Sequence, residues 1–203
     1  MPKHIYSYLA LGDSYTIGEA VPLFESFPYQ TVYLLRKMGF PFHAPEIVAK
    51  TGFTSFELIE QLLHTPLPES FDFVTLLIGV NNQYRGLAID EFKEQCTFLA
   101  QKALHFTGGL ANRIIILSIP DWGATPFAED RNRKEIAQEI LAFNAVVHYI
   151  ALQKKIQYID ITETTRAVSG KEDYLAADNL HYSGKLYALW AKAVSQQIAA
   201  CLL

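Results

Sequence analysis

Cysteine, methionine and excess charge of either sign are scarce in this sequence of 203 residues. The two cysteines, Cys96 and Cys201, form no CxxC pair, so neither a disulfide framework nor a cysteine-based metal site is expected. The 17 basic and 21 acidic residues give a net charge of −4, which argues against a nucleic-acid-binding surface. No apolar run is as long as a membrane-spanning helix.

The amino terminus shows no export signal. Residues 1–4 lead directly into an apolar segment, without the apolar core and small-residue cleavage site of a signal peptide. The sequence therefore predicts a cytoplasmic protein, and a secreted protein already trimmed of its leader would look the same.

Apolar segments of two kinds alternate along the chain. Short runs rich in β-branched and aromatic residues predict five strands, at residues 5–9, 46–50, 71–78, 113–119 and 156–161. Apolar residues at helical spacing predict helices between them, beginning for example at Ser26 and Asp90. This alternation indicates one α/β domain spanning residues 1–203, a three-layer α/β/α flavodoxin-like sandwich. Right-handed crossovers then give a five-stranded parallel sheet with strand order 2-1-3-4-5.

The buried faces of two helices can also be predicted. The helix that begins at Thr54 or Ser55 carries Phe56, Ile59 and Leu63 on one face. The last helix, after Ser183, is expected to turn these residues inward: Leu186, Leu189, Trp190, Val194 and Ile198. The polar segment 162–179 is expected to be irregular.

A serine near one end of the sequence and a histidine near the other are residue types that nucleophilic catalysis uses. Gly12 and Asp13 break an apolar run and present Ser14 just beyond a strand. A serine hydroxyl is inert unless a base takes its proton. His181 can act as that base, and Asp178 can hold the imidazole in the required tautomer.

An acyl-transfer site also needs donors for the oxyanion of the tetrahedral intermediate. Gly52 follows the second predicted strand and can offer a backbone N–H with no side chain in the way. Asn81 follows the third strand and can offer its side-chain amide, and the backbone N–H of Ser14 is a third candidate. Because the carboxyl ends of parallel strands share one edge of the sheet, these groups are expected to meet there.

These four segments resemble those of the SGNH (GDSL-type) hydrolases, a family of esterases and lipases. The matching residues are Gly12-Asp13-Ser14, Gly52, Gly79-Val80-Asn81, and Asp178 with His181 three residues later. Tyr15 stands where the family name has leucine. The resemblance implies a flavodoxin-like fold and a serine hydrolase that acts on small-molecule esters without a cofactor.

Each of these residues also has an ordinary explanation when taken alone. Asparagine is common in turns, which would explain Asn81, and a glycine at position 52 can be needed only because the backbone there has a positive φ angle. Asp13 is expected to hydrogen-bond its own loop rather than act as a second acid. The other histidines have no neighbours with metal-ligand spacing, so no metal is expected.

Three further residues are candidates for the substrate pocket: Tyr15, Arg85 and Trp122. Arg85 can pair with an anionic group of the substrate or can simply be exposed. Trp122 can stack on a sugar, line an acyl channel or only cover the edge of the sheet.

The sequence favours an esterase for short-chain acyl or acetyl esters of small molecules or sugars. A lysophospholipase or thioesterase is the alternative within the same class. A non-catalytic binding module for an anion or nucleotide is disfavoured, since no Gly-rich phosphate loop is present. The natural ester, the acyl-chain length and the oligomeric state are not specified by the sequence.

Overall fold

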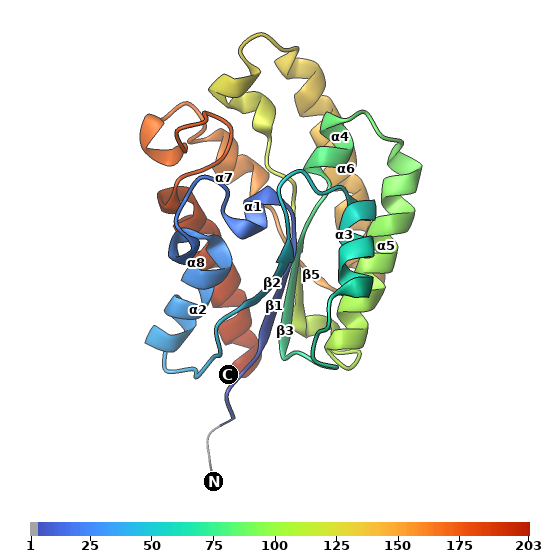
Figure 1. The fold of residues 1–203 in the computed structure, drawn as a ribbon, viewed down its shortest axis with the longest axis vertical. Coiled ribbons are helices and arrows are strands. Elements are labelled where there is room, and N and C mark those ends of the chain that lie inside the picture. Colours follow the sequence, from blue (N-terminus) through green and yellow to red (C-terminus); the bar gives the residue numbers. More distant parts are fainter. Residues whose placement is uncertain (1–3) are drawn as a thin grey trace.

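The computed structural model describes residues 4–203, and a parallel sheet lies at its centre (Figure 1). The five strands of that sheet are arranged in the order β2-β1-β3-β4-β5, which confirms the predicted topology. Their bounds are β1 Tyr8–Gly12, β2 Glu46–Ala49, β3 Phe73–Leu77, β4 Ile114–Leu117 and β5 Gln157–Ile159. The prediction of no signal peptide concerned residues 1–4, of which residues 1–3 lie outside the described part.

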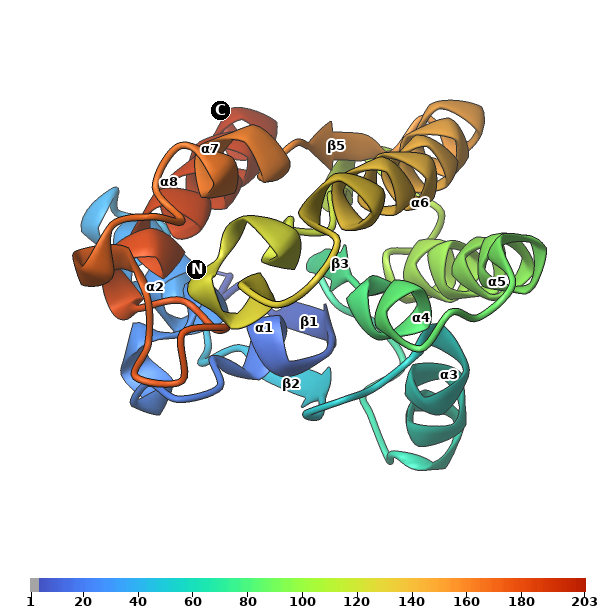
Figure 2. The same ribbon diagram turned by 90° about the horizontal axis from the view of Figure 1, so that it is seen from above.

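Helices cover both faces of the sheet. Their bounds are α1 Ser14–Ile17, α2 Phe27–Lys37, α3 Ser55–His64, α4 Val80–Tyr84, α5 Ile89–Phe106, α6 Arg133–Lys154, α7 Thr162–Arg166 and α8 Gly184–Leu202. Helices α2 and α8 pack together on one face, and α3, α5 and α6 cover the other (Figures 1 and 2). Short 3₁₀ turns complete the chain: η1 Leu23–Glu25, η2 Ala111–Arg113, η3 Trp122–Ala124, η4 Pro126–Ala128 and η5 Glu172–Tyr174.

The three central strands are buried along their whole length. Every residue of β1, β3 and β4 is buried, whereas the edge strands β2 and β5 are partly exposed. Strands covered by helices on both faces read as continuous apolar runs, which is why these segments stood out in the sequence. The three central strands therefore form the middle of the hydrophobic core.

The first strand is shifted from its predicted position. It begins at Tyr8 rather than Ile5 and continues to Gly12. Before it, Tyr6 makes only an isolated bridge to Phe42. Because β1 pairs with β2 and β3 as far as Gly12, the turn that carries Ser14 follows directly from the most buried part of the sheet.

The predicted buried face of α3 was wrong for two of its three residues. Ile59 is partly buried against the core, but Phe56 and Leu63 are 54% and 51% exposed, and Leu58 and Leu62 are buried instead. At its first turn, Thr54 and Glu57 form a capping box that marks the start of the helix. Ser55 at the same end is buried, since it bonds to groups on neighbouring helices.

Other helix details also differ from the predictions. Ala88, not Asp90, occupies the N-cap of α5, and Asp90 lies in the first turn. Ser26 and Ser183 occupy N-cap positions, but their hydroxyls donate to the carbonyls of Leu23 and Asp173 instead of capping. Leu189 is 40% exposed, and the segment expected to be irregular contains α7 and η5.

Candidate active site

Ser14 is the first residue of α1, directly after the tight turn that ends β1. Asp13 is the N-cap of this helix, and its Oδ1 accepts a hydrogen bond from the Tyr15 N–H at 3.0 Å. A Cβ on Gly12 would collide with the Thr16 side chain and the Leu77 carbonyl oxygen, so only glycine fits there. The turn therefore fixes Ser14 at the carboxyl edge of the sheet, which Figure 2 views from above.

A chain of two hydrogen bonds joins Ser14, His181 and Asp178. Nε2 of His181 lies 2.9 Å from Oγ of Ser14, and Nδ1 lies 2.7 Å from Oδ2 of Asp178. With Asp178 ionised, the Nδ1–H donates to the carboxylate and Nε2 can accept the serine proton. Ser14 and His181 are both buried. The structure thus brings together the three residues that the sequence proposed as a triad.

The Asp178 carboxylate is itself held by the backbone. Its Oδ1 accepts from the N–H groups of Leu180 and His181 at 3.0 and 2.9 Å. Partial burial would raise the pKa of Asp178, but the hydrogen bonds from the His181 side chain and from these N–H groups outweigh it. The pKa of Asp178 therefore lies below its ordinary value, so the group is ionised at neutral pH and can orient the imidazole.

Gly52 and Asn81, two of the predicted oxyanion donors, line the same cavity as Ser14 and His181. Asn81 lies on α4 and donates one amide hydrogen to the Phe53 carbonyl oxygen at 2.9 Å, which leaves the other amide hydrogen available. Gly52 has a φ of +79°. Among residues 4–203, neither the Ser14 N–H nor the Gly52 N–H donates to a protein acceptor. These groups are therefore free to bind an anionic oxygen.

The cavity has a volume of about 190 Å³ and a mostly apolar wall. Beside the polar groups already described, it is lined by Tyr15, Val80, Tyr84, Trp122, Phe127 and Leu180, with Thr51 at one side. Tyr84 and Phe127 lie in the segments after β3 and β4 that the sequence had placed at this edge. Sequence reasoning missed Val80 and Leu180, whose only signal was proximity in the chain to Asn81 and His181.

Tyr15 forms part of the wall and supports the histidine. Its ring stacks on that of Tyr182 at 5.5 Å between centroids and lies 5.4 Å from the His181 ring. Trp190 packs against it edge-on. A larger aromatic side chain in place of leucine thus fills the space beneath the imidazole, and burial raises the pKa of the Tyr15 phenol well above its ordinary value.

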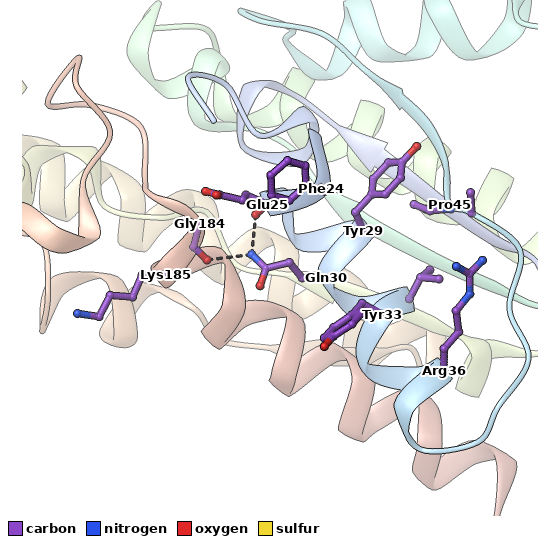
Figure 3. A pocket seen from close by; sticks show the side chains of 11 residues that line it. Phe24, Glu25, Tyr29, Gln30, Tyr33, Arg36, Pro45, Gly184 and Lys185 are labelled. Carbon is purple, nitrogen blue, oxygen red and sulfur yellow. Dashed lines mark hydrogen bonds between the residues drawn. The ribbon is translucent and has the colours of Figure 1, made fainter. Parts of the chain in front are cut away.

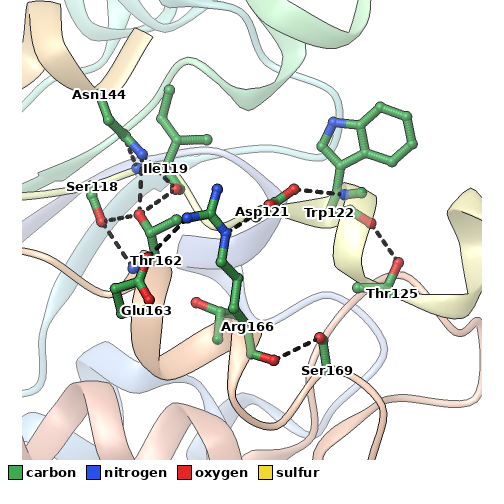
Figure 4. A network of polar contacts seen from close by, with 12 residues as sticks. Ser118, Ile119, Asp121, Trp122, Thr125, Asn144, Thr162, Glu163, Arg166 and Ser169 are labelled. Carbon is green, nitrogen blue, oxygen red and sulfur yellow. Dashed lines mark hydrogen bonds and ion pairs between the residues drawn. The ribbon is translucent and has the colours of Figure 1, made fainter. Parts of the chain in front are cut away.

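Trp122 is held through its own indole and through the residue before it. Its indole N–H donates to Oε1 of Gln83 at 2.7 Å, and the amide of Gln83 donates to Glu139 at 2.6 Å. The preceding residue, Asp121, accepts from the Gly123 N–H and from Arg166 on α7 at 2.8 Å (Figure 4). Trp122 is therefore a rigid wall of the cavity rather than a loose cover of the sheet edge.

Arg85 does not line this cavity. Its guanidinium donates to the Gly52 carbonyl oxygen at 2.6 Å and faces the Glu57 carboxylate at 3.4 Å. The expectation that Arg85 is available to an anionic substrate group is therefore not matched by its contacts.

Asp13 is fully buried next to Ser14. Its Oδ1 bonds to its own turn, as expected, whereas Oδ2 has no hydrogen-bond partner among the described residues. Burial, only partly offset by backbone hydrogen bonds, raises the pKa of this carboxyl to about 7. A buried acid thus lies beside Ser14 without bonding to His181.

A second and larger hollow of about 580 Å³ lies away from Ser14 and His181 (Figure 3). Phe24, Tyr29 and Tyr33 line it, together with residues at the start of α8. At its inner side, the amide of Gln30 donates to the carbonyls of Glu25 and Gly184 at 2.6 and 2.8 Å. This bond pair ties the segment that follows Ser14 to the segment that follows His181.

Residues 4–203 lack two other kinds of feature. That part of the chain has no group of three or more His, Cys, Asp and Glu side chains placed to hold a metal ion. None of its helices is both long and apolar enough to cross a membrane. Cys96 and Cys201 are free thiols.

One family of known proteins matches the sequence over most of its length. A sequence profile of the GDSL-like lipase/acylhydrolase family matches residues 10–189. Among curated proteins, none is similar enough in sequence to match the chain.

Several solved structures have the same fold. A lipase/acylhydrolase from Enterococcus faecalis is 20% identical, with a TM-score of 0.74, and the match covers 96% of this chain and 95% of that one. An acetylxylan esterase from Geobacillus stearothermophilus is 19% identical, with a TM-score of 0.73 and coverage of 95% and 94%. The esterase EstA from a Pseudoalteromonas species is 17% identical, with a TM-score of 0.70 and coverage of 97% and 98%. At these identities the likeness is evidence for the fold.

Proposed function

Because this chain belongs to the GDSL-like lipase/acylhydrolase family and is a carboxylic ester hydrolase, we propose that it works through an acyl-enzyme formed on Ser14. In this proposal His181 is the general base and Asp178 orients it. The observation that carries the proposal is the unbroken hydrogen-bond chain from Ser14 Oγ through the imidazole to Asp178, at 2.9 and 2.7 Å.

The proposed reaction has two halves. Oγ of Ser14 attacks the ester carbonyl carbon while Nε2 of His181 takes the hydroxyl proton. The C–O bond to the alcohol then breaks, and the imidazolium gives its proton to the departing alkoxide. Water, deprotonated by the same imidazole, attacks the acyl-enzyme and releases the acid. Ser14 recovers its proton from His181.

Both tetrahedral intermediates place a negative charge on the former carbonyl oxygen. We assign its stabilisation to the N–H groups of Ser14 and Gly52 and to the amide of Asn81. Donors that are fixed before the reaction need no reorganisation when the charge develops, which is why they lower the barrier. The absence of protein acceptors for the two N–H groups in the described chain supports this assignment.

The size of the cavity supports a short acyl group. Pockets for drug-sized ligands usually measure about 300–1,000 Å³, and this one is about 190 Å³. Its wall includes Trp122, which is held rigidly and cannot easily swing aside. We therefore favour acetyl or other short-chain esters of small molecules or sugars. That one structural relative is an acetylxylan esterase agrees with this choice.

One observation favours the alternative of a longer acyl chain. Tyr84 and Phe127 at the cavity are 47% and 41% exposed, so they offer an apolar surface beyond it. A lysophospholipid or acyl thioester can use such a surface. A non-catalytic binding module is no longer an alternative, given the family to which the chain belongs.

A panel of aryl esters from acetate to palmitate tests the proposal, run beside acetylated sugars, lysophospholipids and acyl thioesters. We expect the highest kcat/KM with the acetate or butyrate ester. The Ser14→Ala variant should hydrolyse none of the esters measurably. A maximum at long chains would favour the alternative. A fluorophosphonate label should attach to the peptide that contains Ser14, and labelling elsewhere would refute the proposed nucleophile.

A further inference from the structure

The loop that carries Gly52 is bonded to the segment after β3 along its length. Arg85 donates to the Gly52 carbonyl oxygen at 2.6 Å, and Asn81 donates to that of Phe53 at 2.9 Å. Asn82 accepts from the Ser55 N–H at 2.9 Å and donates to the Ser55 hydroxyl at 2.8 Å. Two of the proposed oxyanion donors, Gly52 and Asn81, thus belong to segments that hold each other.

Arg85 is well placed to link these segments. Its backbone N–H donates to the Asn81 carbonyl oxygen at 3.1 Å, while its side chain reaches Gly52. The same guanidinium faces the Glu57 carboxylate, which is also bound by Thr54 at the start of α3. One side chain therefore connects the Asn81 segment, the Gly52 loop and the first turn of α3.

Gly52 is held both by its own turn and from outside it. The Phe53 N–H donates to the Lys50 carbonyl oxygen at 3.2 Å, which closes a turn across Gly52, and the φ of +79° at Gly52 favours glycine. Among the described residues other than its chain neighbours, the only heavy atom within 4 Å of the place of a Cβ is Nη2 of Arg85, at 3.5 Å. The guanidinium is therefore the nearest group from outside the turn on this side of Gly52.

We propose that Arg85 is a positioning residue of the oxyanion hole, and that its grip on the Gly52 carbonyl keeps the Gly52 N–H and the Asn81 amide aimed at one point. This inference rests on the acyl-enzyme function proposed above. It differs from the sequence-based expectation, in which Arg85 binds an anionic group of the substrate.

The effect of Arg85 is geometric more than electrostatic. Its side chain is 45% exposed, so solvent screens its charge at the cavity. Donors that no longer point at the oxyanion stabilise the transition state less. The oxyanion is present only in the transition states and the tetrahedral intermediates, so substrate binding is little affected. Loss of Arg85 therefore lowers kcat and leaves KM for a neutral ester nearly unchanged.

The test compares Arg85→Met with the unaltered protein on a neutral aryl acetate. We expect kcat to fall about tenfold and KM to change less than about twofold, which is a smaller loss than removal of a donor itself. An alkylboronic acid provides a second readout, since its boron becomes tetrahedral and anionic when Ser14 Oγ adds. Its affinity should fall by about the same factor as kcat. The Arg85→Lys variant should recover only part of kcat and of the boronate affinity, because lysine lacks the planar guanidinium group of arginine.

The chain offers a matched control. Arg36 is also exposed and donates through Nε and Nη2 to the Phe42 carbonyl oxygen at 3.0 and 2.7 Å, but it lines the other hollow. Arg36→Met should lose a similar backbone contact without a change in kcat.

Two results would overturn the proposal. One is an unchanged kcat and boronate affinity in a folded Arg85→Met protein. The other is a higher KM for an anionic ester such as a hemisuccinate, with kcat unaffected, which would make Arg85 a substrate-binding residue. Failure of the proposed function is a separate result, since it would show as retained activity in Ser14→Ala.

Discussion

Oγ of Ser14 lies 2.9 Å from Nε2 of His181, although the two residues are 167 positions apart in the chain. The contact is possible because β1 delivers Ser14 to the edge of the sheet where the loop before α8 brings His181. Helix α8 packs against α2, and Gln30 on α2 bonds to the carbonyls of Glu25 and Gly184. The pair is thus set by packing of whole elements and not by a local motif.

Replacement of the serine tests the centre of the mechanism. Ser14→Ala should lower kcat by about 10⁴-fold or more, as is found for triad members that act as a unit. Thermal unfolding should be nearly unchanged, since only a hydroxyl is removed. Activity close to that of the unaltered protein would exclude Ser14 as nucleophile.

Replacement of the orienting carboxylate should be almost as severe. Asp178→Asn keeps the shape but favours the wrong imidazole tautomer, so kcat should fall by about 10⁴-fold. The rate of fluorophosphonate labelling is the direct measurement, because it reports on activation of Ser14 alone. Labelling at the usual rate would mean that another group orients His181.

The Asn81 amide should matter only when charge develops. Asn81→Ala should lower kcat by about 10²–10³ with little change in KM. Since the same side chain bonds to the Phe53 carbonyl, Tm must be measured as well. A raised KM with normal kcat would instead identify Asn81 as a substrate-binding residue.

The wall residue Trp122 should control acyl-chain length. Trp122→Ala enlarges a cavity of about 190 Å³, so the ratio of kcat/KM for octanoate to that for acetate should rise about tenfold or more. Gln83→Leu removes the indole's partner and should give a smaller rise. If both variants kept the chain-length profile of the unaltered protein, the acyl group would have to bind elsewhere.

The buried Asp13 carboxyl should make stability depend on pH. Its pKa is about 7 in the folded protein and 3.8 ordinarily, so the folded state holds the proton more tightly. Folding stability from this group is therefore present below about pH 4 and lost as the pH rises to about 7. At about 1.4 kcal/mol per pKa unit, the loss is at most about 4 kcal/mol.

Asp13→Asn removes this titration and keeps an acceptor for the Tyr15 N–H. Urea unfolding at pH 4, 5.5 and 7.5 should show the variant gaining stability relative to the unaltered protein as the pH rises. Groups with lowered pKa values, such as Asp178, contribute equally to both proteins and cancel in the comparison. Parallel curves for the two proteins would contradict the buried-acid interpretation.

The sequence was sufficient for the sheet and for the groups at its edge. Continuous apolar runs are typical of strands buried on both faces, and alternation with helices leaves few right-handed arrangements. Ser14, Gly52, Asn81 and His181 could be predicted to lie together because each follows or flanks such an element, and all four line one cavity.

Contacts between loops could not be predicted in this way. Ser55 at the start of α3 bonds to Asn82 and Gln95, which are 27 and 40 residues away, and periodicity within α3 carries no sign of these partners. The support of Trp122 by Gln83 joins residues 39 positions apart. A long polar side chain such as that of Arg85 can reach several hydrogen-bond partners. Which partner it takes depends on the conformations of the loops, and hydrophobic periodicity does not predict these conformations.

The wide separation of Ser14 and His181 along the chain has a consequence for synthesis on the ribosome. The strand that presents the hydroxyl emerges long before the imidazole and α8, the helix that follows it. Under the proposed mechanism, a nascent chain can assemble most of its sheet and still hydrolyse nothing. Ester turnover would then begin only when α8 docks, so the onset of activity reports directly on that step of folding.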